Sequence, residues 1–456
     1  MKAEGFINTG YQRLVSYEVE GGGFSWFGEA PANQILTSYG LMEFHDMAQV
    51  HPVDENLISR TQQWLASRQQ ADGSWKADAE YLHEDSWGRI QVQDLPPTAY
   101  VTWALAWSGY TGPELPKAVD YLLGKRGQAG DPYVQAMLAN ALVSSDNLLR
   151  EGKLSDATVE VLEKLLASAK REGDKTWWES EMTGITHSSG KQADLETTGM
   201  AALAFITSGR YPAVAAEILN YLLANKDPRG TWGSTQATVL ALRALALSVG
   251  SRSTKVNADV EVLVNDQSVG THQINAQNSD VMWQVPGTAA LKSGANRVQL
   301  RFSGEGTTLY QIVSRYYLPW SLIEKPAQPP LSITVAYDRQ QLATNDQVTA
   351  HATVTNNTDG TAGMVIVDLG IPPGFTVSAE DLDGLVSAGT ISKYNLTSRQ
   401  IIVYLEKLDP RQKVELSYRL TAKYPIRAQT PVSTVYEYYN PENRSESAPQ
   451  SLVVEG

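Results

Sequence analysis

The sequence predicts a multidomain α plus β protein in which an α/α toroid is followed by β-sandwich domains. Helical patterns dominate before Ser248, and after it Val, Thr, Ile and Tyr alternate with polar residues. The length of 456 residues, at roughly 150 residues per domain, suggests about three domains. We expect a toroid over residues 1–250, a β segment over residues 251–325 and a C-terminal β-sandwich over residues 326–456.

A turn that combines glycine with an aromatic residue recurs through the helical region. Copies lie at residues 23–26, 73–75 and 230–232, and a related Lys-Thr-Trp-Trp sequence lies at residues 175–178. Glycine lets the chain turn tightly, and the aromatic ring can join neighbouring helices. The recurrence indicates a repeated unit, although the spacing between copies is irregular.

A second recurring pattern is a helix that opens on Thr or Ser and continues with small and large apolar residues. It occurs at residues 37–41, 98–105, 197–203 and 235–242. Helices that are apolar on all sides belong inside and charged helices outside, which favours an α/α toroid. The alternative is an open solenoid of helix pairs. Further helices are predicted at residues 56–68, 115–124, 133–144, 156–171 and 213–224, of which 156–171 is the charged, outer type.

The segment after the helices reads as strands. Residues 258–264 alternate and are followed by a turn at residues 265–267. Further strands are predicted at residues 281–284, 297–302 and 308–317, and a Pro-rich linker at residues 325–330 ends the segment.

The last part of the chain reads as a β-sandwich with one short helix. Ser378 is the expected N-cap of this helix, and Glu380 and Asp381 favour its N-terminal turn. Gly384 is expected to weaken the helix. About seven strands in roughly 125 residues are typical of a sandwich. The predicted strands are residues 332–337, 347–356, 363–369, 400–405, 413–422 and 432–439.

Charge and composition exclude several functions. The net charge is −13, from 37 Lys and Arg against 50 Asp and Glu, which argues against nucleic-acid partners. The chain contains no cysteine, so no disulfide, thiolate metal site or cysteine nucleophile forms within it. No apolar run is long enough to span a membrane, and residues 1–20 lack the pattern of a signal peptide.

The motifs of catalysis are scarce. There is no Gly-x-Ser-x-Gly elbow and no His-Glu-x-x-His metal motif, and we expect no cofactor and no metal. A toroid enzyme acting on prenyl or carbohydrate substrates is the alternative; a glycosidase would need two facing carboxylates. Glu84, Asp85, Glu179 and Glu181 are the available carboxylates, and each also reads as a solvated surface residue.

Several segments together resemble the α2-macroglobulin family. The thioester domain of that family is similar to FINTGYQRLVSY at residues 6–17, GGFSWFGE at 22–29, LTSYGL at 36–41, WLASRQQADG at 64–73 and GTWGSTQATVLAL at 230–242. The receptor-binding domain is similar to GMVIVD at residues 363–368, PGF at 373–375 and VYEYY at 435–439. The resemblance covers nearly the whole chain in the correct order.

The resemblance implies an α/α toroid, a CUB-like segment and a macroglobulin-type sandwich. It also implies broad-range endopeptidase inhibition by a non-enzymatic trap, in which a buried thioester between Cys and Gln captures lysines of a protease. The family's Cys–Gln motif lies upstream of the counterpart of Tyr11, and this chain has no cysteine. We therefore expect a part of such a trap without the thioester, with proteases as partners through upstream regions.

The resemblance implies that His83 lies near the family's acyl-transfer position. Complement relatives carry in the toroid a histidine that takes over the acyl group, and the nearest residues here are Glu84 and Asp85, with His83 one step away. His83 is the candidate for acyl or proton transfer, and the alternative is a loop histidine without function. The receptor-binding helix of animal relatives offers paired lysines, whereas residues 378–389 contain none.

The resemblance also implies a periplasmic or extracellular location, because relatives are secreted in animals and periplasmic or membrane-anchored in bacteria. The lack of cysteine fits a bacterial relative. Asn356, Asn395 and Asn443 begin glycosylation sequons, which would be unused there. A thioester-free scaffold that binds a partner through the toroid face is a third interpretation.

Overall fold

The structure is a computed structural model that divides into two compact units. One unit comprises Met1–Ala244 and Leu318–Gly456, and the other comprises Leu245–Tyr317. The described residues are 2–26, 28–78, 94–185, 188–227, 230–251, 256–279, 281–306, 308, 310–322 and 328–456.

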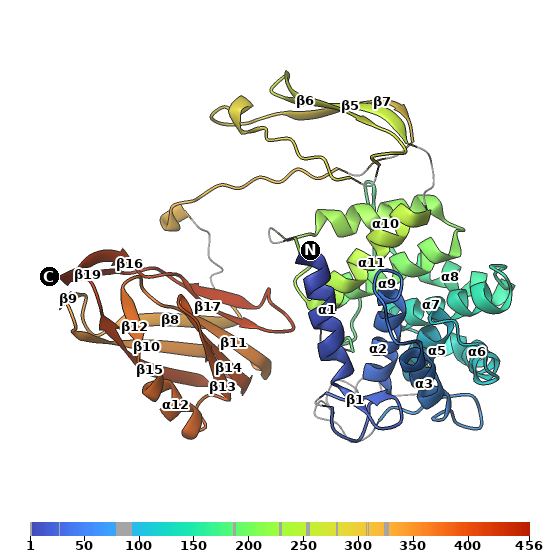
Figure 1. Cartoon of the computed structure of the whole chain (residues 1–456), viewed down its shortest axis with the longest axis horizontal. Helices are drawn as coiled ribbons and strands as arrows, with labels where there is room; N and C mark the ends of the chain where they lie inside the picture. Colours follow the sequence, from blue (N-terminus) through green and yellow to red (C-terminus); the bar gives the residue numbers. More distant parts are fainter. Residues whose placement is uncertain are drawn as a thin grey trace. The chain divides into compact units, whose positions relative to one another are not determined.

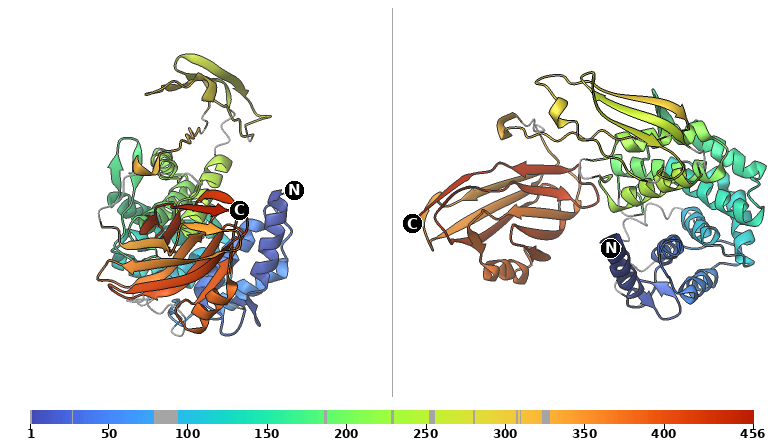
Figure 2. Two further views of the ribbon diagram at one scale, coloured as in Figure 1. Left: turned by 90° about the vertical axis from the view of Figure 1, so that its left-hand side faces the viewer. Right: turned by 45° about the horizontal axis from the view of Figure 1, so that its top comes forward.

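Helices of the first 251 residues form a ring in which inner and outer helices alternate along the chain (Figures 1 and 2). α2 packs on α5, α5 on α7 and α7 on α9, while α3, α6, α8 and α10 each pack on an inner neighbour. The inner helices are α2 (Gln34–Met47), α5 (Leu95–Trp107), α7 (Pro132–Leu149), α9 (Lys191–Ser208) and α11 (Thr235–Ser251). The outer helices are α1 (Lys2–Val15), α3 (Glu55–Ala66), α6 (Glu114–Lys125), α8 (Asp156–Ala167) and α10 (Pro212–Ala224).

Burial separates the two kinds of helix as the sequence pattern predicts. In α5 every residue from Leu95 to Ala106 is buried, so this helix is enclosed on all sides. In the charged helix α8 only Thr158, Val161, Leu162 and Leu165 are buried, at the spacing of one helical face.

The Thr-containing pattern does not mark helix starts, which corrects the prediction. α2, α5 and α9 begin before their threonines, at Gln34, Leu95 and Lys191, and only α11 begins on its Thr. Some helix starts carry side-chain caps: Asn33 accepts from two backbone N–H groups of α2, and Ser155 accepts from Thr158 of α8. The starts of α5 and α9 have no side-chain capping hydrogen bond.

The threonines instead bind the aromatic turns. The backbone N–H of Trp75 donates to Thr98 Oγ1 at 2.9 Å, that of Trp178 to Thr198 Oγ1 at 3.1 Å, and that of Trp232 to Thr238 Oγ1 at 3.0 Å. In the first copy the backbone N–H of Phe24 donates to Thr37 Oγ1 at 2.8 Å. Each aromatic turn is therefore hydrogen-bonded to the inner helix that follows it, which explains why the two sequence patterns recur together.

The predicted helix over residues 156–171 is too long at its C-terminal end. α8 ends at Ala167, and β3 (Lys170–Glu172) pairs with β4 (Lys175–Trp177) in an antiparallel hairpin. Gly173 has a φ of 60°, which suits the tight turn between them. A second short pair joins β1 (Glu18–Val19) to β2 (Gly23–Phe24).

The unit Leu245–Tyr317 contains a three-stranded antiparallel sheet in the order β6-β5-β7. β5 (Asn257–Val264) and β6 (Gln267–Ile274) form the predicted hairpin, whose turn residues Asn265 and Asp266 have φ of 51° and 67°. β7 (Val298–Glu305) pairs with the other side of β5.

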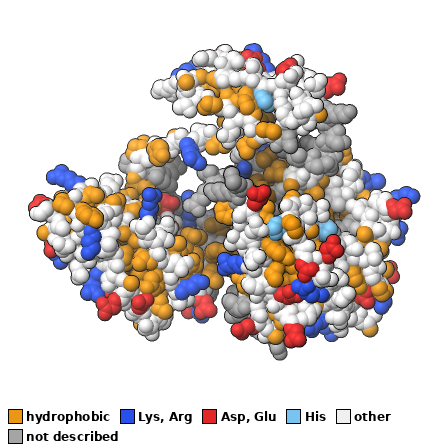
Figure 3. Space-filling view, viewed as in Figure 1, with side chains coloured by type: hydrophobic (Ala, Val, Ile, Leu, Met, Phe, Trp, Pro, Cys, Tyr) orange, Lys and Arg blue, Asp and Glu red, His pale blue; other side chains and the backbone are white. Residues whose placement is uncertain are grey.

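Two strands predicted in this unit are wrong. Residues 281–284 are irregular, and so are the described residues between 308 and 317. Apolar side chains remain exposed there, including Met282 at 80% and Tyr317 at 100%. Figure 3 shows hydrophobic side chains at the surface of this unit. Alternation favours a strand, but a strand also needs a hydrogen-bonding neighbour.

The C-terminal residues form a β-sandwich around one core. Its sheets have the orders β12-β15-β10-β8, β13-β14-β11-β17-β18 and β16-β19-β9. Val354 and Leu420 of the first sheet share this core with Val367 and Val403 of the second. The strands are β8 (Leu331–Tyr337), β9 (Gln341–Ala343), β10 (Gln347–Asn356), β11 (Ala362–Gly370), β12 (Phe375–Val377), β13 (Lys393–Leu396), β14 (Gln400–Leu408), β15 (Lys413–Ala422), β16 (Ile426–Gln429), β17 (Ser433–Glu437), β18 (Arg444–Ser447) and β19 (Ser451–Glu455).

The short helix of the sandwich is α12 (Ala379–Ser387). Ser378 occupies the N-cap position, but its side chain makes no capping hydrogen bond, unlike the prediction. Asp381 instead fixes the helix to β15 by accepting from Arg419 Nη2 at 2.6 Å and from its backbone N–H at 2.8 Å. These hydrogen bonds lower the pKa of Asp381.

Candidate functional site

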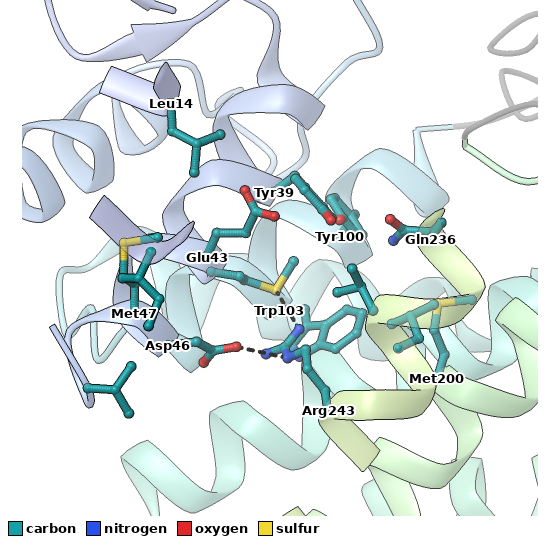
Figure 4. A pocket seen from close by; sticks show the side chains of 15 residues that line it. Leu14, Tyr39, Glu43, Asp46, Met47, Tyr100, Trp103, Met200, Gln236 and Arg243 are labelled. Carbon is teal, nitrogen blue, oxygen red and sulfur yellow. Dashed lines mark hydrogen bonds and ion pairs between the residues drawn. The ribbon is translucent and has the colours of Figure 1, made fainter. Parts of the chain in front are cut away.

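A cavity of about 300 Å³ lies beside the inner helices α2 and α11 (Figure 4). Its walls come from α1, α2, α5, α9 and α11, so the helical ring brings distant parts of the sequence together. The lining residues are Ile7, Leu14, Tyr39, Met42, Glu43, Asp46, Met47, Val50, Tyr100, Trp103, Met200, Gln236, Val239, Leu240 and Arg243.

The cavity contains one carboxyl group with a strongly altered pKa. Burial raises the pKa of Glu43 from 4.5 to about 7, although a hydrogen bond with Tyr39 and the charge of Arg243 oppose this rise. Burial and the neighbouring Glu43 also raise the pKa of Tyr39. Glu43 therefore exchanges a proton near neutral pH, while Tyr39 stays protonated.

Arg243 is the charged residue that joins α11 to α2. Its Nε lies 2.9 Å from Asp46 Oδ2, and Trp107 Nε1 donates to Asp46 Oδ1 at 2.7 Å. The guanidinium lies 4.8 Å from the ring centroid of Trp107 and 5.8 Å from that of Trp103. Both oxygens of Asp46 are thus engaged, and the ion pair connects the two ends of the ring.

Two hydrogen-bond donors at the cavity have no acceptor. Nη2 of Arg243 and Nε1 of Trp103 are buried and unpaired among the described residues. Trp103 is only 1% exposed, so its indole has little access to water. Leaving a buried donor unpaired costs about 1–3 kcal/mol.

This chemistry suits binding better than catalysis. A glycosidase needs two carboxylates that face the substrate, but Asp46 is engaged with Arg243 and Trp107, which leaves Glu43 alone. Among the residues that the structure describes, no three His, Cys, Asp or Glu side chains converge as metal ligands. The described part also contains no helix long and apolar enough to cross a membrane.

A second polar cluster surrounds Glu196 of α9. Glu196 is buried, hydrogen-bonds Tyr133 and lies with its Oε1 3.4 Å from Ser234 Oγ. Burial and Glu196 raise the pKa of Tyr133 far above its usual value. The carboxyl group of Glu196 and its hydroxyl neighbours form an internal network of the ring.

Polar contacts near this cluster reach the sandwich. The backbone N–H of Ser189 donates to Asn440 Oδ1 at 2.9 Å, and Gln192 Nε2 donates to Glu442 Oε2 at 3.2 Å. Asn440 and Glu442 lie between β17 and β18. Burial raises the pKa of nearby Asp194, and the charge of Glu442 is a smaller contribution.

The candidate site residues predicted from the sequence are not brought together within the described part of the structure. His83, Glu84 and Asp85 lie outside the described residues. Of the other two carboxylates, Glu181 is exposed, and Glu179 pairs with Lys170 at 3.7 Å.

Sequence reasoning missed the cavity residues, although a signal was present. Arg243 is the one charged residue of α11, and Glu43 lies in an otherwise mostly apolar stretch of α2. A charge inside an apolar helix calls for a partner or a function.

Profiles of known domains match most of the chain. The A-macroglobulin TED domain matches residues 1–247, and the A-macroglobulin receptor binding domain matches residues 360–449.

Curated relatives are much longer than this chain. Ovostatin of Gallus gallus is 23% identical over 99% of this chain and 31% of its own length. Complement C3 of Oncorhynchus mykiss is 26% identical over 95% of this chain and 26% of its own length. The chain thus spans between about a quarter and a third of these relatives.

Solved structures share the fold at low identity. A crystal structure of native alpha-2-macroglobulin from Escherichia coli, spanning domain MG7 to the C-terminus, has a TM-score of 0.61 at 16% identity, covering 98% of this chain and 67% of that one. Salmonella alpha-2-macroglobulin reacted with methylamine has a TM-score of 0.59 at 17% identity, covering 97% and 27%.

Proposed function

The chain belongs to the A-macroglobulin family, whose members are protease-trapping inhibitors rather than enzymes, and from this we propose that it is one part of a broad-range endopeptidase trap. The main support for this proposal is the order of the matched domains. The TED domain over residues 1–247 is followed by the receptor binding domain over residues 360–449. We also propose that the boundaries between the three domains lie at about residues 250 and 325.

In this proposal the chain supplies the helical ring and the sandwich but not the thioester. A thioester needs a cysteine sulfur, and the sequence has none. Protease capture would then depend on regions of the full-length protein outside this chain. The cavity beside α2 and α11 also supports a non-catalytic role for this chain, because its side chains suit binding better than catalysis.

We propose proteases as the partners and a periplasmic or extracellular location. A net charge of −13 disfavours nucleic acid, and the absence of cysteine fits a bacterial member. Cell fractionation with an antibody against residues 326–456 tests the location; recovery in the cytosol would contradict it.

His83 remains the candidate for acyl or proton transfer, with Glu84 and Asp85 beside it in sequence. The test is His83→Asn in the full-length protein, with covalent capture of a glycerol or lysine acceptor as the readout. A changed ratio of ester to amide product supports the role, and an unchanged ratio refutes it.

The function itself is tested by comparing the full-length protein with residues 1–456 alone. Each is mixed with trypsin and then with casein or a small chromogenic peptide. A trap protects casein but leaves the peptide accessible, and this chain alone should protect neither. A scaffold without trapping is the second candidate, favoured by the open cavity; it predicts partner binding without any protease.

A further inference from the structure

One aromatic turn carries a second tryptophan that the other turns lack. Trp178 is the fully buried residue whose backbone binds the next inner helix. Trp177 precedes it, at the position that Ser74 and Thr231 hold in the other tryptophan-containing copies. Trp177 is half-buried and stacks on Tyr221 of α10, with ring centroids 5.0 Å apart and an interplanar angle of 7°. The repeated unit therefore forms without an aromatic residue at this position.

Trp177 and Tyr221 border a second cavity, of about 310 Å³, where the β3–β4 hairpin meets the end of α10. Its lining residues are Glu172, Lys175, Trp177, Tyr221, Ala224 and Asn225. It shares none of them with the cavity beside α2 and α11. Glu172 and Ala224 are exposed, so the cavity opens to solvent. Its volume is at the lower end of the range of about 300–1,000 Å³ that small-molecule sites occupy.

Hydrogen bonds hold the hairpin to α10 on either side of this cavity. Asn220 Nδ2 donates to the backbone carbonyl of Asp174, in the hairpin turn, and to its Oδ2, both at 3.2 Å. Thr176 Oγ1 donates to Glu217 Oε2 at 2.7 Å. The walls are therefore in place before a ligand arrives, which lowers the entropic cost of binding.

The cavity combines donors and acceptors with little net charge. Glu172 supplies acceptors and Lys175 supplies donors, and the two are paired in the register of the hairpin. Burial raises the pKa of Tyr221 to about 12, so its hydroxyl stays uncharged at neutral pH. An anion would meet the Glu172 carboxylate and the negative end of α10, and a cation would meet the Lys175 ammonium. An uncharged polar ligand avoids both conflicts.

A sugar ring matches this combination of surfaces. One face of a pyranose exposes C–H groups that pack on an aromatic ring, and its hydroxyls both donate and accept hydrogen bonds. Asn225 adds an amide that is held in place, because its Nδ2 donates to the Tyr221 carbonyl at 2.9 Å. A purely apolar ligand fits less well, since it would bury Glu172 and Lys175 without partners.

We propose that the cavity between the β3–β4 hairpin and α10 is a binding site for a neutral pyranose sugar. Trp177 and Tyr221 pack against the ring of the sugar. Glu172 accepts hydrogen bonds from its hydroxyls, and Lys175 donates to them. The site goes beyond the proposed trap, because sugar binding here needs neither a protease nor a thioester.

The test is saturation-transfer difference NMR on the whole chain, with maltose, cellobiose, lactose and N,N′-diacetylchitobiose as the probes. Trp177→Ala removes aromatic surface from the site. Ala224→Arg fills the cavity from an exposed position at the end of α10, where a basic residue suits the helix terminus. Tyr424→Ala is the matched control, because Tyr424 is a 68% exposed aromatic residue of the sandwich. Circular dichroism checks that each variant folds.

We expect saturation transfer to the ring protons of at least one disaccharide, reduced about tenfold by Trp177→Ala and by Ala224→Arg but unchanged by Tyr424→Ala. Lys175→Met should weaken binding several-fold, because the sugar loses a charged donor. If Trp177→Ala does not fold, Ala224→Arg decides the result, since its added side chain lies at the surface.

Three results would overturn the proposal. The first is no saturation transfer to any of the four disaccharides. The second is undiminished transfer in the folded Ala224→Arg variant, which would mean that the sugar binds elsewhere. The third is transfer to choline or to glucuronate but to no disaccharide, which would identify a site for an ion. None of these results bears on casein protection by the full-length protein, so the two proposals fail independently.

Discussion

Trp178 Nε1 donates a hydrogen bond of 2.7 Å to the carbonyl of Leu165, near the end of outer helix α8. The same bond recurs between Trp75 and Leu65 at 2.8 Å, and between Trp232 and Leu222 at 2.6 Å. Each tryptophan is fully buried. Together with the backbone bond to a threonine, the indole connects an outer helix to the next inner helix, so each copy is a unit of the ring.

Trp178→Phe should destabilise the helical ring. The substitution keeps an aromatic ring but removes the indole hydrogen bond to the carbonyl of Leu165, to which Ser168 also donates, at a cost of about 0.5–1.5 kcal/mol. The measurement is urea unfolding followed by circular dichroism at 222 nm. Trp177→Phe is the control, because Trp177 is half-buried and stacks on Tyr221, which phenylalanine preserves. Equal losses from the two variants would contradict the role of the indole hydrogen bond.

Thr198→Val should also destabilise the ring, by removing the acceptor of the Trp178 backbone N–H, at a cost of about 1–3 kcal/mol. Because Thr198 and Trp178 act in one unit, the double variant Trp178→Phe/Thr198→Val should depart from additivity by at least about 0.5 kcal/mol. The pairing Trp75→Phe/Thr198→Val joins two separate units and should be additive. Additivity in both pairs would mean that the two bonds do not form one unit.

The recurrence of these units was visible in the sequence, but their geometry was not. The Gly-aromatic turn and the Thr-containing helix both mark these units correctly, because glycine, tryptophan and threonine are each required there by a turn or a hydrogen bond. The interpretation of Thr as a helix start was wrong, because the hydroxyl binds the preceding turn rather than its own helix end. That partner is more than six residues away in most copies, beyond what local patterns show.

Helix α1 was not predicted from periodicity, since Gly5 and Gly10 weaken the helical pattern. In the opposite direction, the alternating residues 308–317 predicted a strand, and the described part of this segment is irregular. Strand formation depends on a neighbouring edge, which a single segment does not reveal. The cavity was missed for the same reason, because Glu43 and Arg243 meet only when the ring brings α2 and α11 together.

Glu43 should make the helical ring less stable as the pH rises from about 4.5 to about 7. The folded state keeps the proton up to about pH 7, whereas the unfolded chain releases it near 4.5, so the unfolded state binds fewer protons in this window. At about 1.4 kcal/mol per pH unit, the pKa difference of about 2.5 corresponds to at most about 3.5 kcal/mol. Glu43→Gln should flatten this slope and raise stability at pH 8.

The pH comparison is made by urea unfolding at several pH values between 4 and 8. Glu181→Gln serves as the control, because Glu181 is exposed, and it should follow the unmodified protein. Parallel curves for Glu43→Gln and the unmodified protein would show that Glu43 is not protonated in the folded state.

Asn356 should stay unmodified in a host that glycosylates secreted proteins, despite its sequon. It is fully buried, and its Nδ2 donates to the carbonyls of Gly360, Leu408 and Asp409 at 2.8–3.2 Å. Asn395 is exposed on β13, and its Nδ2 makes a solvent-exposed hydrogen bond of 3.2 Å to the hydroxyl of Tyr404, so the enzyme can reach it. Mass spectrometry of the secreted protein checks both sites; a glycan on Asn356 would contradict the structure of this turn.

We propose that this chain is a non-enzymatic part of a protease trap. The most direct measurement is trypsin digestion of casein and of a small chromogenic peptide, in the presence of the full-length protein or of residues 1–456 alone. We predict that the full-length protein protects casein while the peptide is still cleaved, and that the isolated chain protects neither. Protection of casein by the isolated chain, or none by the full-length protein, would contradict the account.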